Sequence, residues 1–157
     1  MSKRHLLLIV LKRTGAFKHQ HNKRMGLTVG EHLTNTYDDL KRMGASEDVA
    51  LAGGMSSLYG TNSFRTALLM PDQRPIIRGL FGDRTERLAW LFGTINRPMC
   101  FEGESMRNWR TGEDVKVSDE DLYDLRLIEV ANLSDNGVKL TNYPNLERFN
   151  EERQVPK

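Results

Sequence analysis

The chain has 157 residues, of which 38% are hydrophobic and 28% are charged. This length and composition predict one globular domain and exclude collagen-like, disulfide-rich and wholly disordered classes. The longest apolar run, residues 6–11, is far shorter than the ~18 residues of a membrane span, so we expect no membrane association. The single cysteine, Cys100, excludes an internal disulfide and fits a reducing, cytoplasmic setting.

The basic residues gather near the N-terminus. Residues 1–25 hold seven of them and no acid, whereas residues 26–157 hold 16 basic and 21 acidic residues. Such an arm could attract nucleic acid or another anion, or it could fold back on the acidic body of its own chain. We favour the folded-back arm, because it lacks the interleaved aromatic residues of single-strand binders. Nucleic acid stays open as the less favoured partner.

Residues 3–13 form the first element, either a helix or a buried strand, since periodicity does not separate the two in so short an apolar run. The clearest helix starts at Thr28, because Thr28 and Glu31 match the T-x-x-E capping box. Gly44 is placed to end that helix, and Ser46 opens the next one.

In the second half of the chain, residues 75–81 form a short helix with a proline in its first turn. Asp83 and Glu86 match a second cap pair, D-x-x-E, which opens a helix that ends before Pro98. Residues 100–117 are glycine-rich and charged, which predicts a loop or a small hairpin that could act as a lid.

Ser118 caps the last long helix, whose first turn is acidic. The chain therefore has an all-α pattern and one domain, residues 1–157. We divide that domain into the basic arm or helix at 1–25, a core at 26–135, and a polar tail at 136–157 that contains a short helix.

Few residues suggest chemistry on their own. No phosphate-binding loop, dinucleotide motif or C-x-x-C pair occurs, and no histidine lies near Cys100 in the sequence to activate its thiol. His19 and His21 could share a cation or an anion, although neighbouring lysines would repel a metal. His32 lies on the helix that starts at Thr28, where a single histidine is more often a buried core residue than a ligand.

Three stretches resemble a widespread family of small uncharacterised bacterial proteins. The first, VGEHLTNTYDDLKRMGASEDVALAGGMSSLYGTNSF (29–64), is similar to its pattern H-L-x-G-T-Y followed by A-G-L-F-H-S-x-Y-G-T-x-x-F. TERLAWLFGTINR (85–97) and DLYDLRLIEVANLSD (121–135) resemble its downstream blocks. That family resembles a branch of the HD-domain superfamily, which consists of helical metal-dependent phosphohydrolases and a few di-iron oxygenases. The resemblance implies a compact HD-like helical bundle.

The resemblance also implies a metal site, of which this chain keeps only part. His32 matches the first helix histidine of the family, His21 the histidine about ten residues before it, and Arg24 the arginine of that block. Ser56 stands where the family has a second histidine, and Asn96 where it has an aspartate. Because serine and asparagine are poor ligands for transition metals, we expect a weakened or absent site at His32 and His21.

The same positions imply a hydrogen-bonding, mildly positive pocket. Its expected lining residues are Arg24, His32, Ser56, Ser57, Tyr59, Thr61, Asn96 and Arg97. We expect it to hold a small polar or phosphorylated molecule without turnover, with no cofactor or with a divalent metal such as Fe or Mn.

Two alternatives stay open beside this pocket. One is a divergent metal-dependent phosphohydrolase or oxygenase that adds acids such as Asp38, Asp39 or Glu86 to the two histidines. The other is nucleic-acid contact through the basic arm. Association into a homodimer is also open.

Overall fold

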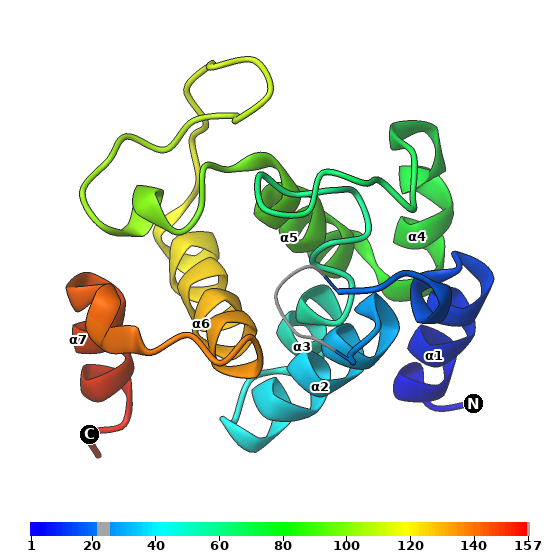
Figure 1. The fold of residues 1–157 in the computed structure, drawn as a ribbon, viewed down its shortest axis with the longest axis horizontal. Coiled ribbons are helices and arrows are strands. Elements are labelled where there is room, and N and C mark those ends of the chain that lie inside the picture. Colours follow the sequence, from blue (N-terminus) through cyan, green and yellow to red (C-terminus); the bar gives the residue numbers. More distant parts are fainter. Residues whose placement is uncertain (22–25, 157) are drawn as a thin grey trace.

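The computed structural model describes residues 1–21 and 26–156 of the chain (Figure 1). Within these residues the protein forms seven α-helices, short 3-10 turns and no β-strand, which confirms the predicted all-α class. In chain order the helices are α1 (Lys3–Arg13), α2 (Val29–Arg42), α3 (Glu47–Gly53), α4 (Arg74–Phe81), α5 (Asp83–Thr94), α6 (Asp119–Asp135) and α7 (Pro144–Arg153). None of these helices has both the length and the apolar character needed to cross a membrane.

Local hydrogen bonds explain where the main helices begin. The capping box of α2 is present: Glu31 N donates to Thr28 Oγ1 at 3.2 Å, and Thr28 N donates to Glu31 Oε1 at 3.2 Å. Ser46 and Ser118 cap α3 and α6 more simply, because each hydroxyl oxygen accepts from one backbone N–H, that of Val49 or of Asp121. Each such cap stabilises a helix by about 1 kcal/mol.

The second predicted cap pair is wrong. Gly82 precedes α5, and no side chain caps that helix. Glu86 is instead fully buried and accepts hydrogen bonds from Arg74, Arg78 and Tyr59. The D-x-x-E pattern therefore marks the start of the helix correctly but gives Glu86 the wrong partners, because its true partners lie on α4 and in the turn after α3.

Four helices enclose the core. α2 packs on α3 and α6, and α5 packs on α3 and α6, whereas α1, α4 and α7 lie on the outside of this group (Figure 1). The large side chains with less than 2% exposure include Leu33, Leu51, Leu88, Phe92, Leu125 and Ile128. Burying each such side chain contributes about 1.5–3 kcal/mol, so the apolar faces of these helices supply most of the stability of the bundle.

Residues 3–13 are a helix, not a strand, and α1 docks on the body of the protein. Leu7 and Leu11 are fully buried. Arg4 donates to both carboxylate oxygens of Asp38 on α2, at 3.0 and 2.9 Å, and Lys3 donates to the carbonyl of Leu80 at 2.7 Å. The first part of the basic arm thus folds back onto the chain.

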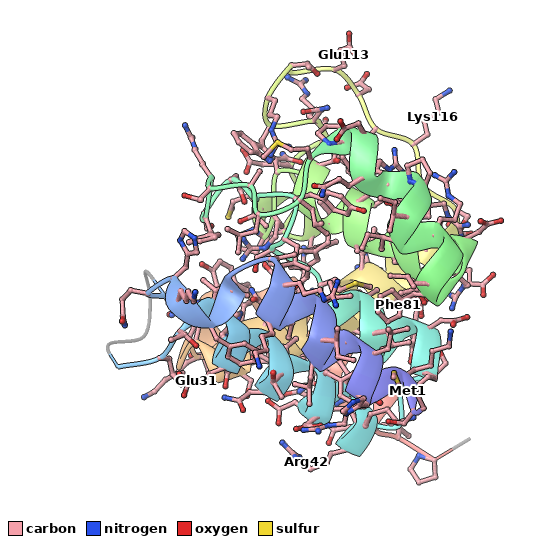
Figure 2. All side chains as sticks on the ribbon, turned by 90° about the vertical axis from the view of Figure 1, so that its right-hand side faces the viewer. Met1, Glu31, Arg42, Phe81, Glu113 and Lys116 are labelled. Atoms are coloured by element: carbon pink, nitrogen blue, oxygen red, sulfur yellow. The ribbon has the colours of Figure 1, made fainter. Side chains whose placement is uncertain are left out.

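The segment between α5 and α6 is a long loop that is tied to the end of α5. Asn96 accepts from the backbone N–H of Arg107 and donates to the carbonyl of Ser105, both at 2.9 Å. Trp109 Nε1 donates to the carbonyl of Gly93 at 2.7 Å. Only isolated β-bridges form among its described residues, such as Arg107 with Asp114, so of the two predicted alternatives this segment is the loop. Exposed charged side chains of this loop point outward (Figure 2).

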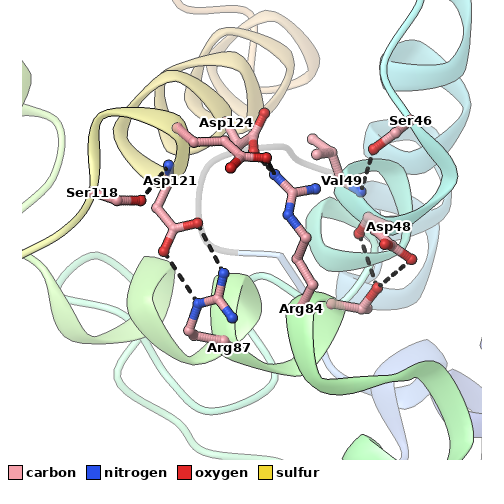
Figure 3. Close-up of polar contacts among 10 residues, drawn as sticks. Ser46, Asp48, Val49, Arg84, Arg87, Ser118, Asp121 and Asp124 are labelled. Atoms are coloured by element: carbon pink, nitrogen blue, oxygen red, sulfur yellow. Dashed lines mark hydrogen bonds and ion pairs between the residues drawn. The ribbon is translucent and has the colours of Figure 1, made fainter.

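Ion pairs join α5 to the first turns of α6 (Figure 3). Arg87 binds both carboxylate oxygens of Asp121, at 3.1 and 3.0 Å, and Arg84 pairs with Asp124. Burial raises the pKa of Asp124, which Arg84 partly offsets. These contacts fix the position of α6, the helix that supplies the polar wall of the cavity described next.

Candidate functional site

A cavity of about 100 Å³ lies between α2, α6 and the segments that follow α3 and α5. A buried water needs roughly 10–15 Å³ of such space, so the cavity holds several waters or one small molecule. Its lining residues are His21, Val29, His32, Ser57, Thr61, Ser63, Phe64, Phe92, Arg97, Pro98, Asn132, Leu133, Asn136, Val138 and Tyr143.

The structure brings four of the predicted pocket residues together. His32 from α2, Ser57 and Thr61 from the segment after α3, and Arg97 from the segment after α5 all line this cavity. Arg24 lies outside the described residues. The pattern identified in the sequence thus converges on one cavity from three separate parts of the chain.

Three other predicted residues do not line the cavity. The Ser56 hydroxyl donates to the carbonyl of Gly53 at 2.8 Å. The Tyr59 hydroxyl donates to Glu86 at 3.0 Å, in the buried cluster between α4 and α5. Asn96 holds the long loop, as described above. The roles of these three side chains are structural, because each is engaged by the fold.

A buried ion pair closes one side of the cavity. Arg97 and Glu129 have only 5% and 0% of their side chains exposed, and Arg97 Nε donates to Glu129 Oε1 at 2.7 Å. Arg97 Nη1 also donates to Asn62 Oδ1 at 3.3 Å and to Ser63 Oγ at 3.1 Å. Burial raises the pKa of Glu129, and the charge and hydrogen bond of Arg97 oppose that rise.

The ion pair continues into a chain of hydrogen bonds that ends at His32. Asn132 Nδ2 donates to Glu129 Oε2 at 3.1 Å, which directs Asn132 Oδ1 toward His32 Nε2, 2.8 Å away. The other ring nitrogen, Nδ1, lies 2.5 Å from Asp135 Oδ2. Both ring nitrogens therefore face acceptors, and the His32 imidazole satisfies both contacts when each nitrogen carries a hydrogen.

These residues do not fit a metal ion. A metal ligand needs a lone pair on a ring nitrogen, and both nitrogens of His32 are directed at acceptors. The ring of His21 lies edge-on to that of His32, with 4.3 Å between centroids. The acids Asp38, Asp39 and Glu86 are each paired with arginines. Over residues 1–21 and 26–156, no group of three or more histidine, cysteine or acidic side chains is placed to hold a metal.

Two polar atoms on residues of the cavity wall lack a partner within the described part of the chain. They are Ser57 Oγ and Asn136 Oδ1, and both atoms are buried. A buried polar atom without a hydrogen bond costs about 1–3 kcal/mol. A small rotation of either side chain toward the cavity would let a bound molecule or a water supply the missing bond.

Sequence reasoning missed the contribution of α6. Glu129, Asn132 and Asn136 follow one another at spacings of three and four, which places them on one face of this helix. Glu129 and Asn132 interrupt the apolar run of residues 127–133, and this interruption was the signal that could have identified them. Asp135 is three residues after Asn132 and binds His32 from the same helix.

A family model described as a domain of unknown function (DUF6817) matches residues 10–97, more than half of the chain. The match includes α2, α3, α5 and Arg97, and it ends before α6. No curated protein and no solved structure matches the chain. The resemblance to HD-domain proteins stays a prediction.

Proposed function

The chain belongs to the DUF6817 family, which is defined by a domain of unknown function. From the geometry of this chain we propose that it binds a small polar molecule in the cavity without converting it. The cavity is large enough for a molecule of several non-hydrogen atoms. Apolar side chains form much of its wall, and a few polar groups converge on it, as is typical of small-molecule sites. We also propose that it works in the cytoplasm, which suits its single cysteine.

The observation that carries this proposal is the pair of unpartnered oxygens at Ser57 and Asn136. Almost all buried polar groups in proteins have a hydrogen-bond partner, so two exceptions on one cavity wall point to a partner that binds there. Arg97, Asn132 and His32 on the same wall are held in place by the hydrogen-bonded chain from Arg97 to Asp135. Such a rigid wall favours recognition of one ligand shape.

Binding without turnover is supported by the state of the reactive side chains. His32 has both ring nitrogens directed at protein acceptors, so it has no free nitrogen to act as a general base. Cys100 does not line the cavity, and burial raises the pKa of its thiol to about 12, which keeps it protonated and poorly nucleophilic. We propose that this site descends from an HD-like metal centre whose ligands were replaced.

The test is a fragment screen on the full chain, read by ¹H–¹⁵N NMR and by thermal unfolding. We expect hits that shift the resonances of Ser57, His32 and Asn132 and raise the melting temperature. Each of these compounds should be recovered chemically unchanged after incubation with the protein. Ser57→Ala should weaken these hits, whereas Ser134→Ala, an exposed serine on α6, should not. The proposal fails if all hits map away from the cavity, if none is found, or if a hit is converted to a product.

A further inference from the structure

We infer that the cavity prefers an uncharged molecule that combines a carbonyl-type oxygen with an N–H or O–H group, as a small amide does, over a phosphate or carboxylate anion. This inference rests on the proposed function, since it names the chemical class that the same site would take. It differs from the expectation of a mildly positive pocket, which the resemblance had implied for a phosphorylated ligand.

The first argument is the balance of charge. Arg97 is the only arginine, lysine or acid among the described lining residues, and its charge is balanced by Glu129. His32 Nδ1 lies 2.5 Å from the carboxylate of Asp135, so any positive charge on the imidazole is balanced there. The two pairs together leave no excess positive charge. An entering anion would therefore find both groups already engaged by a carboxylate.

The second argument is the energy of removing an anion from water. Burial of an unpaired charge is far more unfavourable than burial of a neutral polar group that keeps its hydrogen bonds. A phosphate bound at Arg97 would share that single positive charge with the carboxylate of Glu129, which has no exposed surface. The two negative groups would repel each other in a buried place, which is unfavourable. A neutral ligand avoids both the cost of removing an anion from water and the conflict with Glu129.

The third argument is the hydrogen-bonding capacity of the wall. Arg97 Nη2 donates to no protein acceptor within residues 1–21 and 26–156. Thr61 Oγ1 accepts from the N–H groups of Ser63 and Phe64, at 3.2 and 2.9 Å, which leaves its own hydrogen to donate. Ser57 adds a hydroxyl, and Asn136 adds one acceptor oxygen. The wall thus offers several donors and one free acceptor.

The complement of that wall is a ligand with an oxygen acceptor and at least one donor. A primary amide presents both on one carbon atom, and its methyl or methylene part would lie on the apolar wall. That wall is formed by Val29, Phe64, Phe92, Leu133 and Val138. The volume of about 100 Å³ suits a molecule of this size.

The experiment compares acetamide with acetate, which has nearly the same shape but a negative charge, and with inorganic phosphate. Each probe is titrated into the full chain at neutral pH and constant ionic strength, and binding is followed by the ¹H–¹⁵N resonances of the cavity. Because so small a probe makes few contacts and binds weakly, the titrations extend through the millimolar range.

We expect acetamide to shift the resonances of Ser57, Asn132 and Asn136, and to bind about tenfold more tightly than acetate or phosphate. Ser57→Ala should weaken acetamide about fivefold, the effect of one lost hydrogen bond, with Ser134→Ala as the matched control. If phosphate or acetate binds in the cavity more tightly than acetamide, the inference is wrong and the proposed function stands. If no probe shifts cavity resonances, the inference is wrong; the broader fragment screen then decides the proposed function separately.

Discussion

Arg97→Met removes the cationic half of the ion pair behind the cavity. Methionine keeps much of the length and apolar character of the arginine stem, so the change chiefly deletes the charge and its hydrogen bonds. Glu129, which has 0% of its side chain exposed, is then left without its cation. The bonds from Arg97 to Asn62 and Ser63 are lost as well.

The expected loss of stability follows from that burial. Removing one partner of a buried ion pair costs about 3–5 kcal/mol. For a domain of this length such a loss lowers the melting temperature by roughly 10 °C, at about 2–4 °C per kcal/mol. Burial already raises the pKa of Glu129, and removal of Arg97 takes away the largest contribution that opposes this rise, so the pKa rises further. A raised pKa in the folded state favours folding at low pH, and this stability is lost as the pH rises through it. The free energy of unfolding that Arg97→Met loses relative to the wild type should therefore be smaller at low pH.

Urea unfolding followed by far-UV circular dichroism measures this loss, with the denaturant slope unchanged if only stability is affected. Arg78→Met is the control, because Arg78 is 44% exposed and Glu86 keeps Arg74 as a partner; we expect it to cost less than about 1 kcal/mol. The double variant Arg97→Met/Glu129→Leu should recover most of the loss. The reasoning is refuted if Arg97→Met costs no more than the control, or if the double variant loses the sum of the single losses.

Two further predictions concern acid stability and metal. Burial raises the pKa of Glu86, but the hydrogen bond and charge of Arg74, with Tyr59 and Arg78, outweigh burial and lower it overall. The stability that Glu86 supplies is present above its unfolded pKa, about 4.5, and is lost as the pH falls through the lower folded value. Melting temperatures measured from about pH 7 to pH 3 should therefore fall less steeply for Glu86→Gln than for the wild type; equal slopes would contradict this. Treatment with a strong chelator should leave the melting temperature unchanged, and a drop of several degrees would favour the metal-dependent enzyme.

The parts of this fold that depend on local hydrogen bonds could be predicted from the sequence. Thr28, Ser46 and Ser118 each satisfy backbone N–H groups within one turn, so residue type and spacing are enough to place the starts of their helices. Glu86 shows where this reasoning ends. Its spacing from Asp83 imitates a cap, yet its partners come from other elements, and no local pattern reveals them.

The candidate site could be predicted only in part for the same reason. His32, Ser57, Thr61 and Arg97 belong to motifs that could be read along the chain, and they converge on the cavity. The contribution of α6 depends on contacts between residues about 100 positions apart, such as His32 with Asp135. Such contacts are set by how α2 packs on α6, and this packing is not visible in either segment alone.

The hydrogen-bonded chain from Arg97 to Asp135 serves two purposes at once, since the bonds that shape the cavity also fasten α6 to α2 and to the segment after α5. A substitution in this hydrogen-bonded chain that suited a different ligand would also weaken the attachment of α6 to the rest of the fold. Relatives that bind other ligands should therefore differ first at the apolar lining positions Val29, Leu133 and Val138. At these positions a methylene group can be added or removed without disturbing the hydrogen-bonded chain.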